Sequence, residues 1–316
     1  MKKVISLILV VMLLAACLTS CGGSGTKVSM ATGGTSGTYY GFCGVVAQVL
    51  NEKLKGTLEI SVESTGASKA NIQLIDSGAS QLAIVQNDVM YYAYTATDMF
   101  EGEKAINSFS AVASCYPEVI QIVANTNINS IEDLKGKNVS VGDAGSGTEF
   151  NAKQILAAYG ISFDDINVSN QSFADSADAI TNGSIDAAFI VAGTPTTAVT
   201  ELATTHEFTL LDIDDEHIAA LQAQYGFYTK VTVPGGTYSC VSKDTQAVAV
   251  MATIVASNKL SEDAVYAFTK ALFDYKADIT AGHTKGAELD TATAVSGISI
   301  PFHAGAEKYY KEVGAL

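Results

Sequence analysis

Two short runs of glycine and hydroxyl residues carry the clearest chemistry in this sequence. Thr35-Ser36-Gly37-Thr38 follows a short apolar stretch, and Ser146-Gly147-Thr148 follows another, with Glu149 directly after it. Each run then opens a stretch of helical periodicity. The first N–H groups of a helix have no partner within the helix, and the helix dipole adds roughly half a positive charge there. We therefore expect the two runs to occupy equivalent places in two α/β units and to bind an anion.

The first run also has a plainer interpretation, a strand-to-helix turn with no ligand. It is not a nucleotide-binding loop of the Walker type, because no Gly-Lys-Ser or Gly-Lys-Thr follows it. Gly34-x-x-Gly37 also lacks the spacing of a dinucleotide-binding loop. The run alone is therefore a weak signal.

Charge narrows the class of ligand. The chain of 316 residues has a formal net charge of -15, with 18 lysines and no arginine. Such an acidic chain argues against nucleic acid as a partner, because phosphates are neutralised by clustered Lys and Arg. Without arginine, a carboxylate cannot be held by a bidentate guanidinium fork. An anion must be held by lysine, hydroxyl groups or backbone N–H groups.

Metal and enzyme chemistry have little support in the sequence. There is no Cys-x-x-Cys pair or Cys/His cluster, so we expect no metal site and no cofactor. The histidines are isolated from one another, and no serine lies in a Gly-x-Ser-x-Gly elbow. We therefore expect a binding protein rather than an enzyme.

The elements around the two runs predict an α/β fold. Strand-like stretches alternate with helical ones before residue 95, and the same rhythm returns after residue 136. Such alternation predicts parallel sheets, whose ligands lie beyond the carboxyl ends of the strands. We expect two Rossmann-like domains joined by crossing hinge strands, with a ligand cleft between them. The first domain takes residues 27–115 and 236–316, and the second takes 116–235.

Further candidate ligand contacts lie near strand ends and helix starts. Gln86 ends a buried strand, and Tyr39 lies in the first turn after the first run. Ser68 and Asn71 open another helix, and their alternative roles are those of an N-cap and a first-turn residue. Gly193 precedes a further helix and completes this group.

The two crossing stretches, 109–124 and 231–241, carry residues of their own interest. Tyr238 could cover the solute from the second crossing, with core packing as its alternative role. Cys115 and Cys240 fall one on each crossing and would lie side by side at the hinge. A disulfide there would stiffen the hinge motion, so we expect two free, buried thiols.

The N-terminus resembles the signal of a bacterial lipoprotein. Two lysines and an apolar stretch precede two tetrads that end at Cys17 and Cys21, each with a small residue before the cysteine. We favour Cys21, because residues 22–26 begin with Gly-Gly-Ser-Gly and would form a flexible tether. We expect a signal peptide over 1–21 and a lipid anchor at Cys21 that holds the protein at the membrane, outside the cytoplasm. Cleavage without lipidation is the alternative.

Several motifs together resemble one family through their order and spacing. They are residues 32–40, 76–78, 82–88, 141–149, 186–189 and 301–306. The chain resembles a TAXI-type solute-binding protein, the extracytoplasmic receptor of a tripartite ATP-independent periplasmic (TRAP) transporter. The resemblance covers essentially the whole chain after the signal.

The resemblance implies a fold like that of type II periplasmic binding proteins, with two domains that close on a small anionic solute. It also implies TRAP membrane subunits as partners and glutamate, glutamine or small carboxylates as ligands. Receptors of the dicarboxylate-type branch usually clamp a carboxylate with an arginine, which this chain lacks. A sensory subunit for a membrane kinase and a lipoprotein hydrolase are the alternative functions.

We expect the ligand carboxylate to lie where the two glycine and hydroxyl runs meet. Glu149 and Asp88 could hold an amino group, and Gln86 or Tyr39 could reach a side-chain amide or a second carboxylate. Glutamate or glutamine is therefore the first expected ligand, and an unaminated dicarboxylate is the second.

Overall fold

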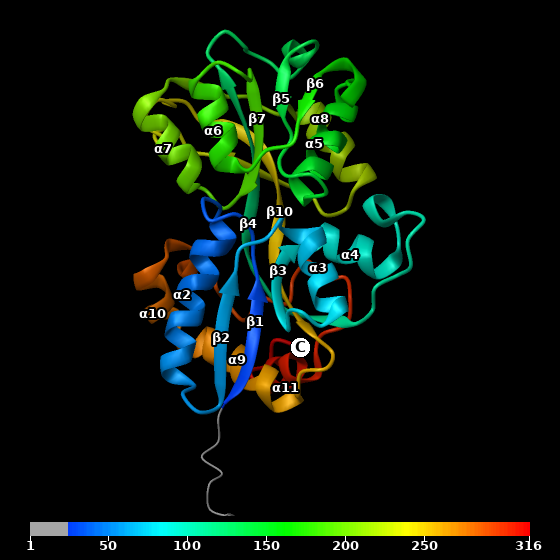
Figure 1. The fold of residues 1–316 in the computed structure, drawn as a ribbon, viewed down its shortest axis with the longest axis vertical. Coiled ribbons are helices and arrows are strands. Elements are labelled where there is room, and N and C mark those ends of the chain that lie inside the picture. Colours follow the sequence, from blue (N-terminus) through cyan, green and yellow to red (C-terminus); the bar gives the residue numbers. More distant parts are fainter. Residues whose placement is uncertain (1–24) are drawn as a thin grey trace, which may run out of the picture.

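The computed structural model describes residues 25–316, which form two lobes stacked along the long axis of the molecule (Figure 1). The predicted signal peptide, with both candidate lipidation cysteines, lies outside the described residues. The predicted tether lies mostly outside them as well, and its last residue, Thr26, already belongs to the first strand.

The first lobe is built from the two ends of the chain. Its elements are β1 (Thr26–Ala31), α2 (Thr38–Lys53), β2 (Leu58–Glu63), α3 (Ser68–Ser77), β3 (Leu82–Gln86), α4 (Asn87–Thr95), α9 (Glu262–Asp274), α10 (Lys276–Gly282) and α11 (Ala304–Glu312). The strand β1 pairs in parallel with β2 and β3. Every residue of β3 is buried, as its apolar sequence predicts.

The second lobe comes from the middle of the chain. Its elements are β5 (Asn138–Ser140), α5 (Gly147–Ala158), β6 (Asn167–Ser169), α6 (Phe173–Thr181), β7 (Ala187–Ala192), α7 (Thr197–Thr205), β8 (Phe208–Leu210), α8 (Asp215–Gln224) and β9 (Thr229–Val233). The strand β5 pairs in parallel with β6 and β7. Both lobes therefore contain the parallel α/β units that the sequence predicts.

Two long strands, β4 (Phe109–Asn125) and β10 (Thr245–Ser257), run through both lobes and join them. They pair with each other in antiparallel fashion. The strands of residues 25–316 form one ten-stranded sheet in the order β2-β1-β3-β10-β4-β7-β5-β6, in which β8 also pairs with β4 and β9 with β10. The predicted crossing strands thus form the centre of a sheet shared by the lobes.

The strand β4 continues through Pro117, where the sequence suggests an interruption. Pro117 lies opposite Met251, and next to it the register slips, because Tyr116 pairs with Ala252 while Ser114 pairs with Thr253. Cys115 is therefore the extra residue of a bulge. A bulge provides the irregular ladder in which proline, with no N–H group to donate, is tolerated.

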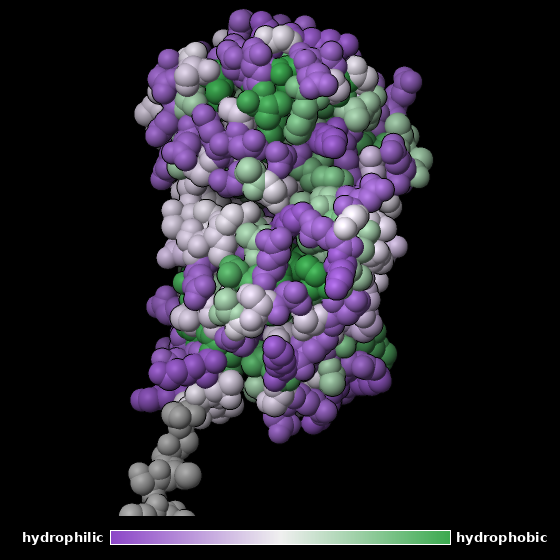
Figure 2. Space-filling model, turned by 45° about the vertical axis from the view of Figure 1, so that its right-hand side comes forward, coloured by the Kyte–Doolittle hydropathy of each residue, from purple (hydrophilic) through white to green (hydrophobic). Residues whose placement is uncertain are grey.

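The apolar cores place the boundary between the lobes within β4 and β10. Tyr116 packs in a core of the first lobe, and Val119 packs in a core of the second. On the return strand, Val250 belongs to the second lobe and Ala252 to the first. The sequence division at residue 236 therefore differs from the packing, because the stretch before Val250 packs with the second lobe. Hydrophilic residues are spread over both lobes on the face shown in Figure 2, with smaller hydrophobic patches between them.

Contrary to the sequence prediction, Cys115 and Cys240 do not lie side by side at the hinge. Cys115 lies on β4 in the first-lobe core, but Cys240 lies in the turn after β9 and packs, half-buried, against a core of the second lobe. The return crossing is β10 itself, because β9 folds back on β10 as a hairpin. Cys43, Cys115 and Cys240 are all free.

Candidate ligand site between the lobes

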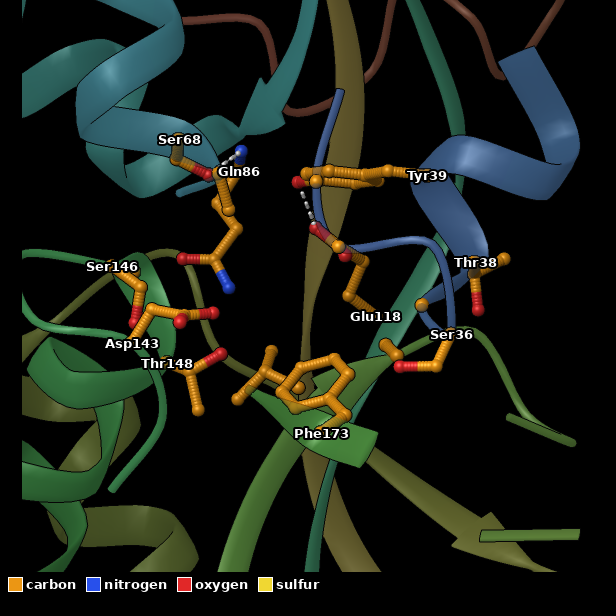
Figure 3. A pocket seen from close by; sticks show the side chains of 17 residues that line it. Ser36, Thr38, Tyr39, Ser68, Gln86, Glu118, Asp143, Ser146, Thr148 and Phe173 are labelled. Atoms are coloured by element: carbon orange, nitrogen blue, oxygen red, sulfur yellow. Dashed lines mark hydrogen bonds between the residues drawn. The ribbon is translucent and has the colours of Figure 1, made fainter. Parts of the chain in front are cut away.

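An enclosed cavity lies between the lobes, where the carboxyl ends of β1 and β3 face the loop before α5. Its volume is about 40 Å³. The side chains labelled around it in Figure 3 come from both lobes and are Ser36, Thr38, Tyr39, Ser68, Gln86, Glu118, Asp143, Ser146, Thr148 and Phe173. The sequence predicts a cleft in this place.

The start of α2 forms one wall of the cavity. Its N-cap residue, Gly37, provides no side-chain cap, and no acidic residue lies in the first turn. The first N–H groups of the helix therefore remain available to a ligand. This helix start also contacts the second lobe, because the Thr38 hydroxyl donates to the Gly193 carbonyl at 3.1 Å and the Ala198 N–H donates to the Ser36 carbonyl at 3.3 Å.

The start of α5 forms the facing wall. The Ser146 hydroxyl caps this helix by accepting from the Glu149 N–H at 3.2 Å. Gly142 enters the turn with a φ of +88°, and a Cβ there would lie 2.7 Å from Thr148 Cγ2, so this loop needs glycine. A Cβ on Gly147 would lie 1.7 Å from Gln86 Oε1, which shows how closely α5 approaches the first lobe.

Gln86 reaches into the cavity from the end of β3. Its backbone N–H donates to the Ser68 hydroxyl at 3.1 Å, which fixes the start of the side chain. The side chain is only 3% exposed, and its Oε1 has no hydrogen-bond partner in the described chain. Figure 3 shows its amide pointing between the two lobes, toward Ser146. A buried amide without a partner is costly, so this group is placed to bind something else.

Glu118 is a wall residue that the sequence analysis missed. It lies on β4, is 2% exposed, and accepts a hydrogen bond from the Tyr39 hydroxyl at 2.5 Å through Oε2 (Figure 3). Burial raises the pKa of its carboxyl well above the ordinary range. The available signal was a single acid in the apolar stretch 109–124, directly after a proline. A lone acid on a strand does not reveal which way it points.

Asp143 is a second acid at the cavity that the sequence analysis did not single out. It lies in the loop before α5, and partial burial raises the pKa of its carboxyl. In the described chain, no lysine or histidine lines the cavity. Lys285 lies close to Gly193, but its Nζ pairs with Glu288 Oε1 at 2.6 Å. The site therefore combines two helix starts with two acids and no cationic side chain.

The structure brings most of the predicted contacts together. Nine of the predicted residues line the cavity: Ser36, Gly37, Thr38, Tyr39, Ser68, Gln86, Ser146, Gly147 and Thr148. Tyr39, rather than its neighbour Tyr40, faces the cavity. The rest of the lining consists of the acids Glu118 and Asp143, the glycines Gly33 and Gly34, and the apolar residues Ala67, Phe173, Val191 and Ala192.

The other predicted contacts lie elsewhere. Thr35 is exposed outside the cavity. The Asn71 amide is buried and donates to the Thr32 and Ile84 carbonyls, at 2.5 and 2.8 Å. Glu149 accepts from the Gly145 N–H at 2.6 Å, so its carboxylate folds back on its own loop. The side chains of Asn71 and Glu149 therefore stabilise the loops around the cavity.

Gly193 lies at the contact between the lobes, and Tyr238 packs within the second lobe. Gly193 packs against Thr38, and a Cβ there would lie 2.6 Å from Lys285 Cε. Tyr238 is 1% exposed and lies in a core of the second lobe. Its hydroxyl donates to Gln121 and accepts from the Thr196 N–H. Core packing, the alternative role considered for Tyr238, is the one that its position fits.

A buried polar network joins the lobes beside the cavity, between α4 and α5. Asp88 Oδ2 accepts from Asn151 Nδ2 at 2.9 Å, and the same nitrogen lies 3.0 Å from the Tyr228 hydroxyl. Tyr228 donates to Gln154, whose Nε2 donates to the Tyr92 hydroxyl at 3.3 Å. Burial raises the pKa of Asp88 to about 6. Asp88 is thus part of the contact between the lobes and does not line the cavity.

Residues 25–316 contain neither a cluster of metal ligands nor a membrane-spanning helix. No group of three His, Cys, Asp or Glu side chains in this range could hold a metal ion. No helix in the same range is long and apolar enough to cross a membrane.

The two lobes and the cavity between them have the arrangement of the periplasmic-binding-protein fold. A structure from Bordetella bronchiseptica aligns with a TM-score of 0.53 at 17% identity, over 92% of this chain and 89% of that one. A candidate L-cystine ABC transporter structure from Listeria monocytogenes aligns with a TM-score of 0.52 at 14% identity, over 82% and 95% of the two chains. At these identities the likeness shows the fold alone.

The family follows from the sequence. The family model described as NMT1-like matches residues 30–314, and the chain belongs to this family. A Bordetella pertussis extracytoplasmic solute receptor that binds pyroglutamic acid aligns with a TM-score of 0.46 at 16% identity, over 92% of each chain. The predicted two-domain α/β fold is confirmed.

Proposed function

We propose that this protein is a lipid-anchored extracytoplasmic receptor that delivers a small carboxylate, first of all glutamate or glutamine, to a TRAP transporter. The observation that carries the proposal is the convergence of the starts of α2 and α5, from opposite lobes, on one enclosed cavity. Both helix starts offer N–H groups and partial positive charge to a carboxylate. Membership of the NMT1-like family supports a receptor role.

The size of the cavity supports a small ligand. The enclosed volume of about 40 Å³ leaves no room for a sugar chain or a peptide. The lobes also touch around the cavity, through the bonds of Ser36 and Thr38 with the second lobe. A ligand must therefore enter while the lobes are apart, and closure then surrounds it. This cycle is the hinge closure common to two-lobed receptors.

The polar groups support a ligand with a second polar end. The hydroxyl groups of Ser36, Ser146 and Thr148 can bind carboxylate oxygens, and the unpartnered amide of Gln86 can bind a side-chain amide or carboxyl. Glutamine and glutamate carry both kinds of polar end. An unaminated dicarboxylate is the second candidate.

The transporter type rests on the sequence motifs that resemble TAXI-type receptors, such as residues 32–40 and 141–149. The lipid anchor rests on the tetrad that ends at Cys21. Co-purification of the lipidated protein with large TRAP membrane subunits from its own cells would support this assignment. Co-purification with a membrane kinase instead would favour the sensory alternative.

A thermal-shift panel tests the ligand class on the mature protein without its lipid. The panel holds amino acids, dicarboxylates, sugars and inorganic phosphate. A ligand at a hundred times its dissociation constant stabilises the fold by about 2.7 kcal/mol, which raises the melting temperature by about 5 °C in a protein near this size. We expect such a shift with glutamine or glutamate. A shift with phosphate or sugars alone would refute a carboxylate receptor.

A further inference from the structure

We propose that Glu118 binds a cationic nitrogen of the ligand and thereby selects amino acids over carboxylates that lack an amino group. This inference rests on the proposed function, because it assigns a second contact in the same cavity. It differs from the sequence expectation, which gave the amino group to Glu149 or Asp88. Both of those carboxylates are engaged outside the cavity.

The geometry of Glu118 leaves one oxygen for a ligand. Oε2 accepts the Tyr39 hydroxyl at 2.5 Å, which fixes the carboxylate plane. Oε1 has no hydrogen-bond partner among the described residues, and it is not among their fully enclosed unpartnered atoms. Since Glu118 lines the cavity, this oxygen is open to the cavity. Figure 3 shows the carboxylate near the centre of the site, beneath Tyr39.

The charges around the cavity call for a cation. Glu118 is 2% exposed, and its burial raises the pKa of the carboxyl, which favours the protonated form until a cation pairs with it. In the described chain no cationic side chain lines the cavity, and Asp143 adds a second acid. A ligand ammonium group would supply the missing charge. A dicarboxylate would instead bring more negative charge to two acids.

Gln86 provides an independent sign that the cavity is built for a polar ligand. Its amide is buried, it is aimed into the cavity, and Oε1 has no partner in the described chain. Gln86 stands on the first lobe opposite Ser146, while Glu118 lies on the strand between the lobes. The carboxylate site at the helix starts, the amide and the acid therefore surround the cavity from different sides. An α-amino acid with a short polar side chain offers a matching group to each.

Matched ligand pairs and two variants test this inference. The pairs are glutamine with glutaramate and glutamate with glutarate, which differ only in the α-amino group. Isothermal titration of the mature protein should give at least tenfold tighter binding for the aminated member. The E118Q variant keeps the shape of the side chain and an acceptor for Tyr39 but removes the charge. It should weaken amino-acid binding at least about 30-fold, the low end for loss of one partner of a buried charge pair.

The control is E216Q, at an exposed residue of α8 whose side chain has no hydrogen bond in the described chain, and it should bind like the wild type. Melting temperatures of both variants show whether they fold. If E118Q keeps wild-type affinity, Glu118 acts as a neutral hydrogen-bonding group and the inference is wrong. If both members of a pair bind equally, carboxylate binding stands but selection by Glu118 is refuted. If no member of either pair binds, the glutamate or glutamine receptor proposed above is itself refuted.

Discussion

Asp88 should make the stability of the protein depend on pH, and the substitution Asp88→Asn should remove that dependence. The carboxyl is 1% exposed between the lobes, and Asn151 is its partner from the second lobe. Burial raises its pKa from 3.8 to about 6. At about 1.36 kcal/mol for each pKa unit, this shift corresponds to about 3 kcal/mol of folding free energy.

The direction of the effect follows from which state holds the proton more tightly. The folded protein has the higher pKa, so the stabilisation that comes from protonated Asp88 is fully present below pH 3.8. It is lost as the pH rises through about 6. The D88N variant carries no titrating group at this position. Its free energy of unfolding, relative to that of the wild type, should therefore rise by up to about 3 kcal/mol between pH 4 and pH 7.

Urea denaturation of both proteins at about four pH values across this window measures the difference. Replacing one carboxylate oxygen with an amide nitrogen also alters the bonds to Asn151 and to the Val89 N–H, at about the same cost at every pH. The slope of the difference with pH, rather than its size, is therefore the test. The control is D178N, at an exposed position of α6 without a side-chain hydrogen bond or ion pair in the described chain. A difference that stays constant within about 0.5 kcal/mol across the window would refute the reasoning, because it would leave less than a fifth of the expected shift.

Three further predictions concern closure, thiols and the anchor. G147A should weaken ligand binding about tenfold or more, because its Cβ would lie 1.7 Å from an oxygen of the facing lobe and overpacking costs 1–3 kcal/mol. G44A, on α2 and outside the cavity lining, where a Cβ meets nothing within 4 Å, should bind normally in the same titration. A water-soluble thiol reagent should label the half-buried Cys240 in the folded protein, as mass spectrometry can show. It should label Cys43 and Cys115 only after unfolding, because both are buried. Labelling of all three cysteines at one rate would contradict this difference in burial. C21A should release the protein from membranes in cell fractionation, whereas release by C17A alone would assign the lipid to the first tetrad.

The parts of the site that local patterns encode could be predicted from the sequence. A glycine and hydroxyl run between a strand and a helix places its own backbone N–H groups, so the runs at residues 36–38 and 146–148 were found. Gln86 was found for a similar reason, because the last residue of a parallel strand lies at the ligand edge of the sheet.

The parts that depend on long-range packing could not be predicted. Glu118 faces the cavity because β4 lies between β10 and β7, and a single sequence does not give that order. Tyr238 packs in the core because its hydroxyl meets Gln121, far away along the chain. The division between the domains was misjudged at the return crossing for the same reason, since only tertiary contacts assign residues 238–250 to the second lobe.

The position of β10 in the sheet constrains the order in which the chain can fold. In the first lobe β10 lies between β3 and β4, with Ile254 opposite both Ile84 and Ala113. When the chain is made or exported from its N-terminus, β3 and β4 therefore cannot form their shared sheet until β10, which begins at Thr245, is present. Contacts at such sequence separation form slowly, because a long loop must close first. The second lobe has most of its chain between β4 and β10 and needs only the first part of β10, up to Val250, so it can assemble while the first lobe is still an open sheet. A chain that stops short of β10 would leave the edges of β3 and β4 unpaired, which is the state most exposed to aggregation.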